Sequence, residues 1–288
     1  MRELVESIAL DDLGALRIRG EDAVRFLQGQ VSNDVTRLTA EHSVIAGYHN
    51  PQGRTIALLR LILVAPNELL AVLPRELAQV VAGRLAKFIL RAKVTIDNAS
   101  DTVRVRGLVG ETPDARAATP GGGSTLVRIA DAPARWLGIY PAGDVALPTG
   151  DRERWRSFDV AQGQPQVYAA TSEDFIGQML NLDALGAIAF DKGCYTGQEV
   201  IARAHYRGRV KRRMQRFVTQ APQQLAPGDS GRLSDGRSFK VVEAVQQAAG
   251  VCEFLAVTAL GVRDEAQTEG TTALIAAMSL PLPYSLPE

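Results

Sequence analysis

Residues 183–213 read DALGAIAFDKGCYTGQEVIARAHYRGRVKRR, and this stretch is the most informative part of the chain. The apolar run Ala187–Phe190 predicts a short strand. A loop that contains Gly193 and Gly197 follows it, and helix-favouring residues begin at Gln198. The sequence therefore predicts a loop between a strand and a helix, a position where functional side chains often gather.

Cys194 lies in this loop, two residues after Lys192 and shortly before the predicted helix. A nearby ammonium group and a helix N-terminus both favour the thiolate, the form of cysteine that attacks electrophiles and binds metals. Cys194 is therefore a candidate catalytic thiol, with Lys192 assisting it. The alternative is inert packing, because free cysteine is among the most buried residue types. Cys252 fits that alternative, since it alternates with Phe254 and Ala256 in a predicted strand.

A positively charged segment follows the loop. The chain has 32 basic and 32 acidic residues, yet no acidic residue occurs between Val200 and Gly228. Such a patch can attract an anionic ligand, such as a glutamate tail, or an RNA backbone. It can equally be a solvated face or a hinge between units. Its basic residues are Arg203, Arg207, Arg209, Lys211, Arg212, Arg213 and Arg216.

Length and composition indicate a globular protein. With 288 residues, 46% of them hydrophobic, the chain can bury a large core and form two or three compact units. Glu3 and Glu6 argue against a signal or transit peptide, and no segment approaches the roughly 20 apolar residues that span a bilayer. Two cysteines fit a reducing compartment. We therefore expect a cytoplasmic protein without a membrane partner.

Other chemistries have little support. The three histidines, His42, His49 and His205, are scattered and no paired-cysteine motif accompanies them, so no metal site is predicted. No GxSxG sequence of the common hydrolases occurs. A nucleophile and base pair formed by Cys194 and His205 is an alternative that nothing in the sequence specifies.

Hydrophobic periodicity and turn residues predict an α+β fold. Up to residue 109 the expected elements are strands at 16–18, 94–96 and 103–109, a helix at 22–32, a hairpin of 44–48 and 55–64, and a helix after Pro74. The apolar face of that last helix would comprise Leu77, Val80, Val81, Leu85, Phe88 and Ile89.

The second half predicts a surface loop at 111–124, a helix at 151–161 and a capping box, Thr171–Asp174, that opens a short helix. Short strands at 214–219, 231–233, 238–245 and 251–260 indicate a small β-barrel. We therefore expect two domains, a mixed α+β core at 1–210 and the barrel at 211–288.

The string KGCYTGQE at Lys192–Glu199 resembles the signature of the YgfZ family, folate-binding relatives of the T-protein of glycine cleavage. The likeness spans nearly the whole chain and is weakest between residues 111 and 147. FLQGQ at Phe26–Gln30 matches a helix of the family, and Pro51–Arg54 matches a hairpin turn. Further matching positions are Asp34, Phe175, Ile176, Gln178, Asn181, Leu182, Ala202, Arg203 and 207–213.

This resemblance implies the aminomethyltransferase fold, in which the core at 1–210 consists of two interleaved α+β subdomains built around antiparallel sheets. Together with the C-terminal barrel they would form a ring of three units around a channel that holds tetrahydrofolate or a derivative. It also implies a role in maintaining iron–sulfur enzymes, including tRNA-modifying ones, and therefore partners of those classes. Cys194 and Lys192 would perform the chemistry. Tyr195 and Tyr206 could stack on a flat heterocycle or simply pack. The residues expected to contact the folate are Gln30, Asn33, Gln162, Asn181, Tyr195, Gln198, Glu199 and Arg203.

Two departures from the T-protein put its reaction in doubt. Its pterin-reading glutamate corresponds to Ala161, which accepts no hydrogen bond, although Gln162 or Gln164 can compensate in part. Its catalytic aspartate has no counterpart in LAVLPREL at Leu70–Leu77, where Glu76 is the only acid. Whether the chain is an enzyme is therefore open.

Three functions stay open on the sequence. The first is a folate-dependent accessory factor. The second is a one-carbon transferase with a displaced acid, for which Asp159, Asp183, Asp191 and Glu199 are the candidates. The third is a non-enzymatic RNA- or protein-binding module whose surface is Arg203–Arg216.

Overall fold

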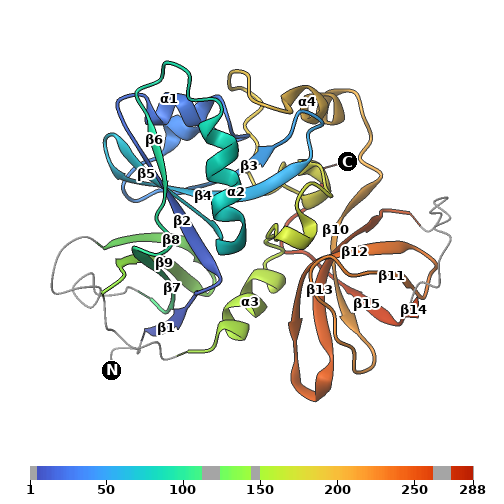
Figure 1. Cartoon of the computed structure of the whole chain (residues 1–288). Helices are drawn as coiled ribbons and strands as arrows, with labels where there is room; N and C mark the ends of the chain where they lie inside the picture. The colour runs from blue at the N-terminus through green and yellow to red at the C-terminus, as the bar shows by residue number, and fades with distance from the viewer. Residues whose placement is uncertain (1–4, 112–123, 144–149, 262–273, 288) are drawn as a thin grey trace. The chain divides into compact units, whose positions relative to one another are not determined.

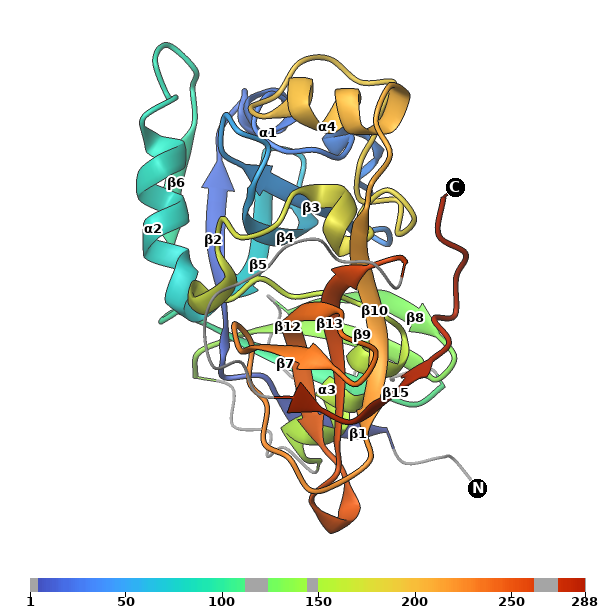
Figure 2. The same cartoon turned by 90° about the vertical axis from the view of Figure 1, so that its right-hand side faces the viewer.

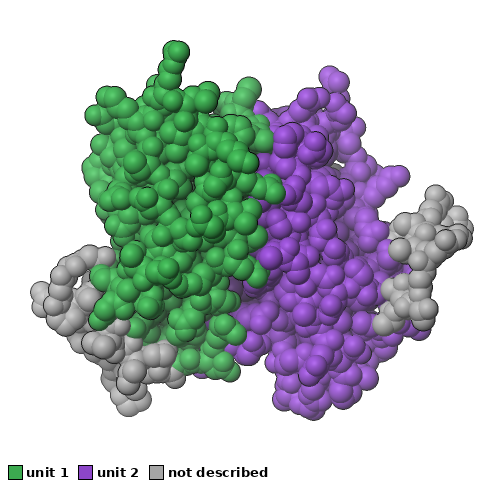
Figure 3. Space-filling view, viewed as in Figure 1, with its two compact units in different colours: residues 1–48, 57–152, 191–196 green, residues 49–56, 153–190, 197–288 purple. Residues whose placement is uncertain are grey.

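The computed structural model describes residues 5–111, 124–143, 150–261 and 274–287 (Figure 1). They form two compact units that alternate along the chain (Figure 3). Unit 1 comprises residues 1–48, 57–152 and 191–196, and unit 2 comprises residues 49–56, 153–190 and 197–288. The expected boundary at 210–211 falls inside unit 2, and an independent C-terminal domain stays a prediction. The expected loop at 111–124 lies almost wholly outside the described residues.

Unit 1 contains a five-stranded sheet with the order β3-β4-β5-β2-β6 (Figure 1). Most side chains of β4 and β5 are buried, which explains why their sequences are almost continuously apolar. The predicted hairpin is confirmed as β3 and β4. The strands are β2 (Leu13–Arg19), β3 (Val44–His49), β4 (Thr55–Ala65), β5 (Glu68–Pro74) and β6 (Thr95–Asn98).

The helix predicted after Pro74 is confirmed as α2 (Arg75–Ala86), which packs against β2 and β6 (Figure 2). Its buried residues are small or aliphatic, and the predicted face is only partly right. Val80 and Phe88 are exposed, because Val80 lies on the other side of the helix and Phe88 lies beyond its end.

A second, four-stranded sheet of unit 1 has the order β1-β7-β9-β8 and is antiparallel throughout. Its strands are β1 (Glu6–Ala9), β7 (Val103–Val109), β8 (Thr125–Asp131) and β9 (Ala134–Pro141). Unit 1 also includes α1 (Ala23–Gln28) and the 3₁₀ turn η1 (Val35–Arg37).

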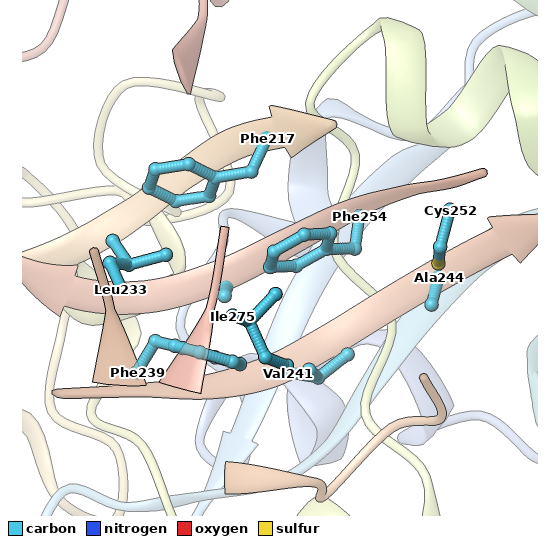
Figure 4. Close-up of a cluster of buried hydrophobic side chains, with 9 residues drawn as sticks. Phe217, Leu233, Phe239, Val241, Ala244, Cys252, Phe254 and Ile275 are labelled. Atoms are coloured by element: carbon cyan, nitrogen blue, oxygen red, sulfur yellow. The ribbon is translucent and has the colours of Figure 1, made fainter. Parts of the chain in front are cut away.

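Unit 2 contains a nearly closed, barrel-like sheet with the order β14-β11-β12-β13-β10-β15. The predicted barrel is thereby confirmed. Cys252 is fully buried in its core beside stacked phenylalanines, as its strand pattern predicted (Figure 4). The strands are β10 (Arg212–Thr219), β11 (Ser230–Leu233), β12 (Ser238–Gln246), β13 (Cys252–Ala259), β14 (Leu274–Ile275) and β15 (Ala277–Leu280). The sequence did not predict β14 or β15.

The other elements of unit 2 are helical. The helix predicted at 151–161 is α3 (Arg152–Ala161), and the one predicted from Gln198 is α4 (Gln198–Tyr206). Three 3₁₀ turns are η2 (Ala169–Thr171), η3 (Gly177–Leu180) and η4 (Ala248–Gly250).

Three local predictions were wrong. The helix predicted at 22–32 ends at Gln28, because the backbone beyond it turns at Gly29. Ala187–Phe190 is buried for the most part but pairs with no strand in the described part of the chain. Thr171 does belong to a capping box. It is the third residue of the 3₁₀ turn η2, whose N-cap is Tyr168, and it is not itself the N-cap of a helix.

None of the helices in the described part of the chain is long and apolar enough to cross a lipid bilayer.

Candidate functional site

The loop residues 191–196 belong to unit 1, and Cys194 is its exposed thiol. Cys252 is the other cysteine of the chain, and it is fully buried. The sulfur of Cys194 is therefore available to a reagent or ligand, whereas that of Cys252 is sealed. Accessibility is a precondition for thiol chemistry, and a catalytic role for Cys194 stays a prediction.

The ammonium group of Lys192 is bound by three backbone carbonyl oxygens at the end of α1. Lys192 Nζ donates to the oxygen atoms of Gln28 at 2.7 Å, Val31 at 2.7 Å and Asn33 at 2.8 Å. An ammonium group has three hydrogens to donate, so these bonds satisfy it completely. These bonds hold the KGC loop against the end of α1 and the residues that follow it. They also place the charge of Lys192 beside these carbonyl groups.

Burial lowers the pKa of Lys192 to about 8, and the carboxylate of Asp34 opposes this change. Asp34 itself accepts hydrogen bonds from the backbone amide and hydroxyl of Thr36, at 3.0 and 2.6 Å. The side-chain bond from Thr36 is the main cause that lowers the pKa of Asp34. Lys192 therefore carries its charge at neutral pH, close to an ionised carboxylate.

The predicted ligand residues of unit 1 differ in what they can still bind. Asn33 is buried, and its side chain donates to the carbonyl oxygen of Ile45 at 2.7 Å and accepts from the amide of Asp34 at 2.8 Å. The Oε1 atom of Gln30 is buried and has no hydrogen-bond donor among the described residues. Tyr195 is buried, which raises the pKa of its phenol. Gln30 thus retains an open acceptor, while Asn33 supports its own loop.

Asn181, in unit 2, is fully buried and adopts a left-handed backbone conformation with φ of 58°. Its Nδ2 atom donates to the carbonyl oxygen of Met214 at 2.9 Å and to the hydroxyl of Tyr284 at 3.3 Å. Its Oδ1 atom is buried without a donor among the described residues. Asn181 therefore connects η3 to β10 and to the C-terminal segment, and its contact with a cofactor stays a prediction.

The remaining predicted ligand residues of unit 2 lie on α3 and α4. Gln162 is half-buried directly after α3, and Gln198 is half-buried in the first turn of α4. Glu199 and Arg203 form an exposed ion pair of 2.9 Å one helical turn apart. The backbone carbonyl oxygen of Ala161 accepts a hydrogen bond from Arg216 at 3.3 Å. The methyl side chain of Ala161 cannot accept a hydrogen bond from a ligand.

Three of the four candidate replacement acids are bound to arginines: Glu199, described above, Asp183 and Asp191. Asp183 forms a two-pronged ion pair with Arg213, at 2.8 and 2.9 Å, and both side chains are only 4% exposed. Asp191 is exposed and pairs with Arg37 at 3.1 Å. These carboxylates are engaged in ion pairs within the protein, and a role as the replacement acid stays a prediction.

Sequence reasoning missed one buried titratable group, His49, which it treated only as an isolated histidine. Its side chain is 1% exposed, and Nδ1 lies 3.3 Å from the hydroxyl of Thr55. Burial lowers the pKa of His49 to about 3. Its position directly after the predicted strand at 44–48 was the available signal.

We expect acid to destabilise the protein through His49. The unfolded chain takes up a proton near pH 6.5 and the folded chain only near pH 3, so stability is lost as the pH falls between these values. The expected loss is about 1.4 kcal/mol per pH unit. Urea unfolding at pH 6 and pH 5 should show this dependence, and His49→Gln should reduce it. His205→Gln, at an exposed position, is the control; equal slopes for wild type and His49→Gln would contradict the assignment.

Among the described residues, no three side chains of His, Cys, Asp or Glu lie together in an arrangement that could hold a metal ion.

The chain is similar in sequence to two curated proteins over most of its length. It is 31% identical to the tRNA-modifying protein YgfZ of Yersinia pestis (strain Pestoides F), with 98% of this chain and 93% of that protein covered. It is 30% identical to the tRNA-modifying protein YgfZ of Colwellia psychrerythraea, with 88% and 85% covered. No protein-family model matches the chain.

The fold is similar to that of the glycine cleavage system aminomethyltransferase T from Bartonella henselae, with a TM-score of 0.67 over 90% of this chain and 79% of that one. The sequence identity of this pair is 14%, so the similarity concerns the fold alone. It confirms the α+β fold of the aminomethyltransferase type. Together with an identity of 30–31% to YgfZ proteins across nearly the full length, it leads to one conclusion: the chain belongs to the YgfZ family.

Proposed function

We propose that this protein acts in tRNA modification, as a folate-binding accessory factor that maintains iron–sulfur enzymes. The observation that carries the proposal is its similarity to tRNA-modifying YgfZ proteins over 98% of the chain. Iron–sulfur and tRNA-modifying enzymes are the expected partners.

Aminomethyl transfer is the competing function, because the fold is that of an aminomethyltransferase. The residues at the two decisive positions do not favour it. Ala161 stands where the T-protein has its pterin-reading glutamate, and Glu76 is an exposed residue in the first turn of α2. Position 161 thus lacks the carboxylate that would read the pterin, and the segment Leu70–Leu77 lacks the acid that would activate the folate nitrogen. An accessory role requires only that the folate be bound.

A buried amide oxygen supports folate binding. Oε1 of Gln30 in unit 1 is buried without a donor among the described residues. An unpaired buried acceptor costs about 1–3 kcal/mol, and a pterin carries amino and ring N–H groups that can satisfy such an oxygen. A bound folate would supply a carrier for one-carbon units. The task of the chain's own residues would be to bind and orient it.

Calorimetric titration with tetrahydrofolate tests this part of the proposal. Gln30→Ala should weaken binding about tenfold, the equivalent of one neutral hydrogen bond. Gln52→Ala, at an exposed turn position, is the matched control and should bind like wild type. Absence of binding to the wild-type protein would remove folate from the function.

The role in tRNA modification is tested in a strain whose own YgfZ gene has been deleted, with mass spectrometry of tRNA nucleosides as the readout. Cys194→Ala should fail to restore the modified nucleosides, whereas Cys252→Ala should restore them. Alkylation of the two native thiols serves as a check of accessibility, because only Cys194 is exposed. Full restoration by Cys194→Ala would exclude the thiol from the mechanism, and failure of the wild-type chain would contradict the proposed function.

A further inference from the structure

The basic segment after α4 divides into two groups. Arg212, Arg213 and Arg216 are committed to partners inside unit 2. Arg213 pairs with Asp183 and Arg216 with Glu253 at 2.7 Å, while Arg212 donates to a backbone carbonyl at the start of β12 at 3.1 Å. These three charges support the fold and are not available to a ligand.

The other group consists of Arg207, Arg209 and Lys211, which are exposed. None of the three makes a side-chain hydrogen bond or an ion pair within the part of the chain that the structure describes. Arg209 and Lys211 lie beyond the last turn of α4, where the helix dipole no longer accounts for a positive charge. The chain there is neither helix nor strand, so alternate residues are up to about 7 Å apart. The result is a row of uncompensated cations.

A group of three aromatic rings, two of them exposed, accompanies this row, and His205 and Tyr206 directly precede Arg207 in the chain. Phe190 and His205 are stacked, with ring centroids 3.7 Å apart and an interplanar angle of 14°. Tyr206 meets both rings edge-on, at 6.1 and 4.7 Å, and is 68% exposed. Large aromatic side chains are usually buried in part, so the exposed rings of His205 and Tyr206, supported by half-buried Phe190, offer flat surface for a further ring.

We propose that these six residues, the α4 surface (Phe190, His205, Tyr206, Arg207, Arg209 and Lys211), bind a single-stranded segment of RNA such as a tRNA loop. Unpaired bases stack on aromatic side chains, and cations contact the phosphates. An acidic peptide would satisfy the cations but would leave the aromatic group without a matching ring. The inference deepens the proposed function, and it rests on that function for the choice of tRNA as the probe.

The charges are tested by the triple variant Arg207→Gln, Arg209→Gln, Lys211→Gln and an unmodified tRNA transcript. We expect affinity to fall at least about tenfold, and the slope of log K against log salt to decrease by about 2, because each contact to a single strand contributes about 0.7. The matched control removes the same charge from unit 1 with Arg25→Gln, Lys87→Gln and Arg91→Gln. Those residues are also exposed and without a side-chain partner among the described residues. Equal weakening by both triples would overturn the proposal.

Stacking is tested separately at Tyr206. Tyr206→Ala should weaken binding about tenfold, whereas Tyr206→Phe should retain it because the ring is kept. A hairpin with an unpaired loop should bind more tightly than a fully paired duplex of the same length. Unchanged affinity for Tyr206→Ala, equal binding of hairpin and duplex, or equally tight binding of a polyglutamate peptide would each overturn the proposal.

The complementation assay separates this inference from the proposed function. If the wild-type chain restores tRNA modification but does not bind tRNA, the α4 surface is not an RNA site and the proposed function stands. If the wild-type chain binds tRNA at this surface but does not restore modification, the proposed function is contradicted. The assignment of the α4 surface as an RNA-binding site is then retained.

Discussion

Replacing Asp183 with asparagine should lower the free energy of unfolding by about 3–5 kcal/mol, the usual cost when one partner of a buried ion pair is removed. The change leaves the guanidinium of Arg213 buried, 4% exposed and opposite a neutral amide. Arg213 would keep its bond of 3.0 Å to the carbonyl oxygen of Gln178 and at most one neutral bond to the asparagine oxygen. Both partners lie in unit 2, so the free energy of unfolding of unit 2 should decrease.

The measurement uses the fact that the chain has two tryptophans, one in each unit. In a Trp136→Phe background, urea unfolding followed by the fluorescence of Trp155 reports on unit 2. Glu199→Gln breaks an ion pair whose side chains are 70% and 85% exposed, and should cost less than about 1 kcal/mol. Asp183→Leu combined with Arg213→Met should recover much of the loss, because two apolar groups leave no unpaired charge. A cost for Asp183→Asn as small as that of Glu199→Gln would contradict this account.

Lys192→Met should destabilise unit 1 by about 2–4 kcal/mol, because it leaves several carbonyl oxygens without their donor. Methionine keeps most of the aliphatic length of lysine, so the loss reports mainly on the ammonium group. Its three bonds, to Gln28, Val31 and Asn33, are 2.7–2.8 Å long. Because Lys192 is only half-buried, water can replace part of these bonds, which keeps the expected cost below the sum for three charged hydrogen bonds.

Fluorescence of Trp136 in a Trp155→Phe background reports on unit 1 and measures this effect. Lys93→Met is the control, because Lys93 forms an exposed ion pair with Glu21 at 2.7 Å and should contribute less than about 1 kcal/mol. Equal stability of the Lys192→Met and Lys93→Met variants would show that the carbonyl contacts do not hold the loop. A large loss would explain a requirement for Lys192 without any chemical step at the Cys194 thiol.

Much of the fold could be predicted from the sequence, because it depends on short-range patterns. The helix after Pro74 and four of the six strands of the barrel, β10 to β13, follow from periodicity and are confirmed. The hairpin turn follows from the chemistry of Asn50 and Gly53: the Asn50 side chain accepts from two backbone amides of the turn at 3.0 Å, and Gly53 has φ of +72°. The difference between exposed Cys194 and buried Cys252 was also visible in their local context.

What the sequence determined alone was therefore the local elements, the KGCYTGQE loop and the likeness to the YgfZ family. Only the tertiary structure decided that the ammonium group of Lys192 binds carbonyl oxygens about 160 residues earlier in the chain. It also decided that Arg212, Arg213 and Arg216 of the basic segment bind partners within unit 2, as Arg213 does with Asp183. The physical reason is that an ammonium or guanidinium group binds any suitable acceptor. Its actual partner depends on which distant segments the packed core brings within hydrogen-bond distance.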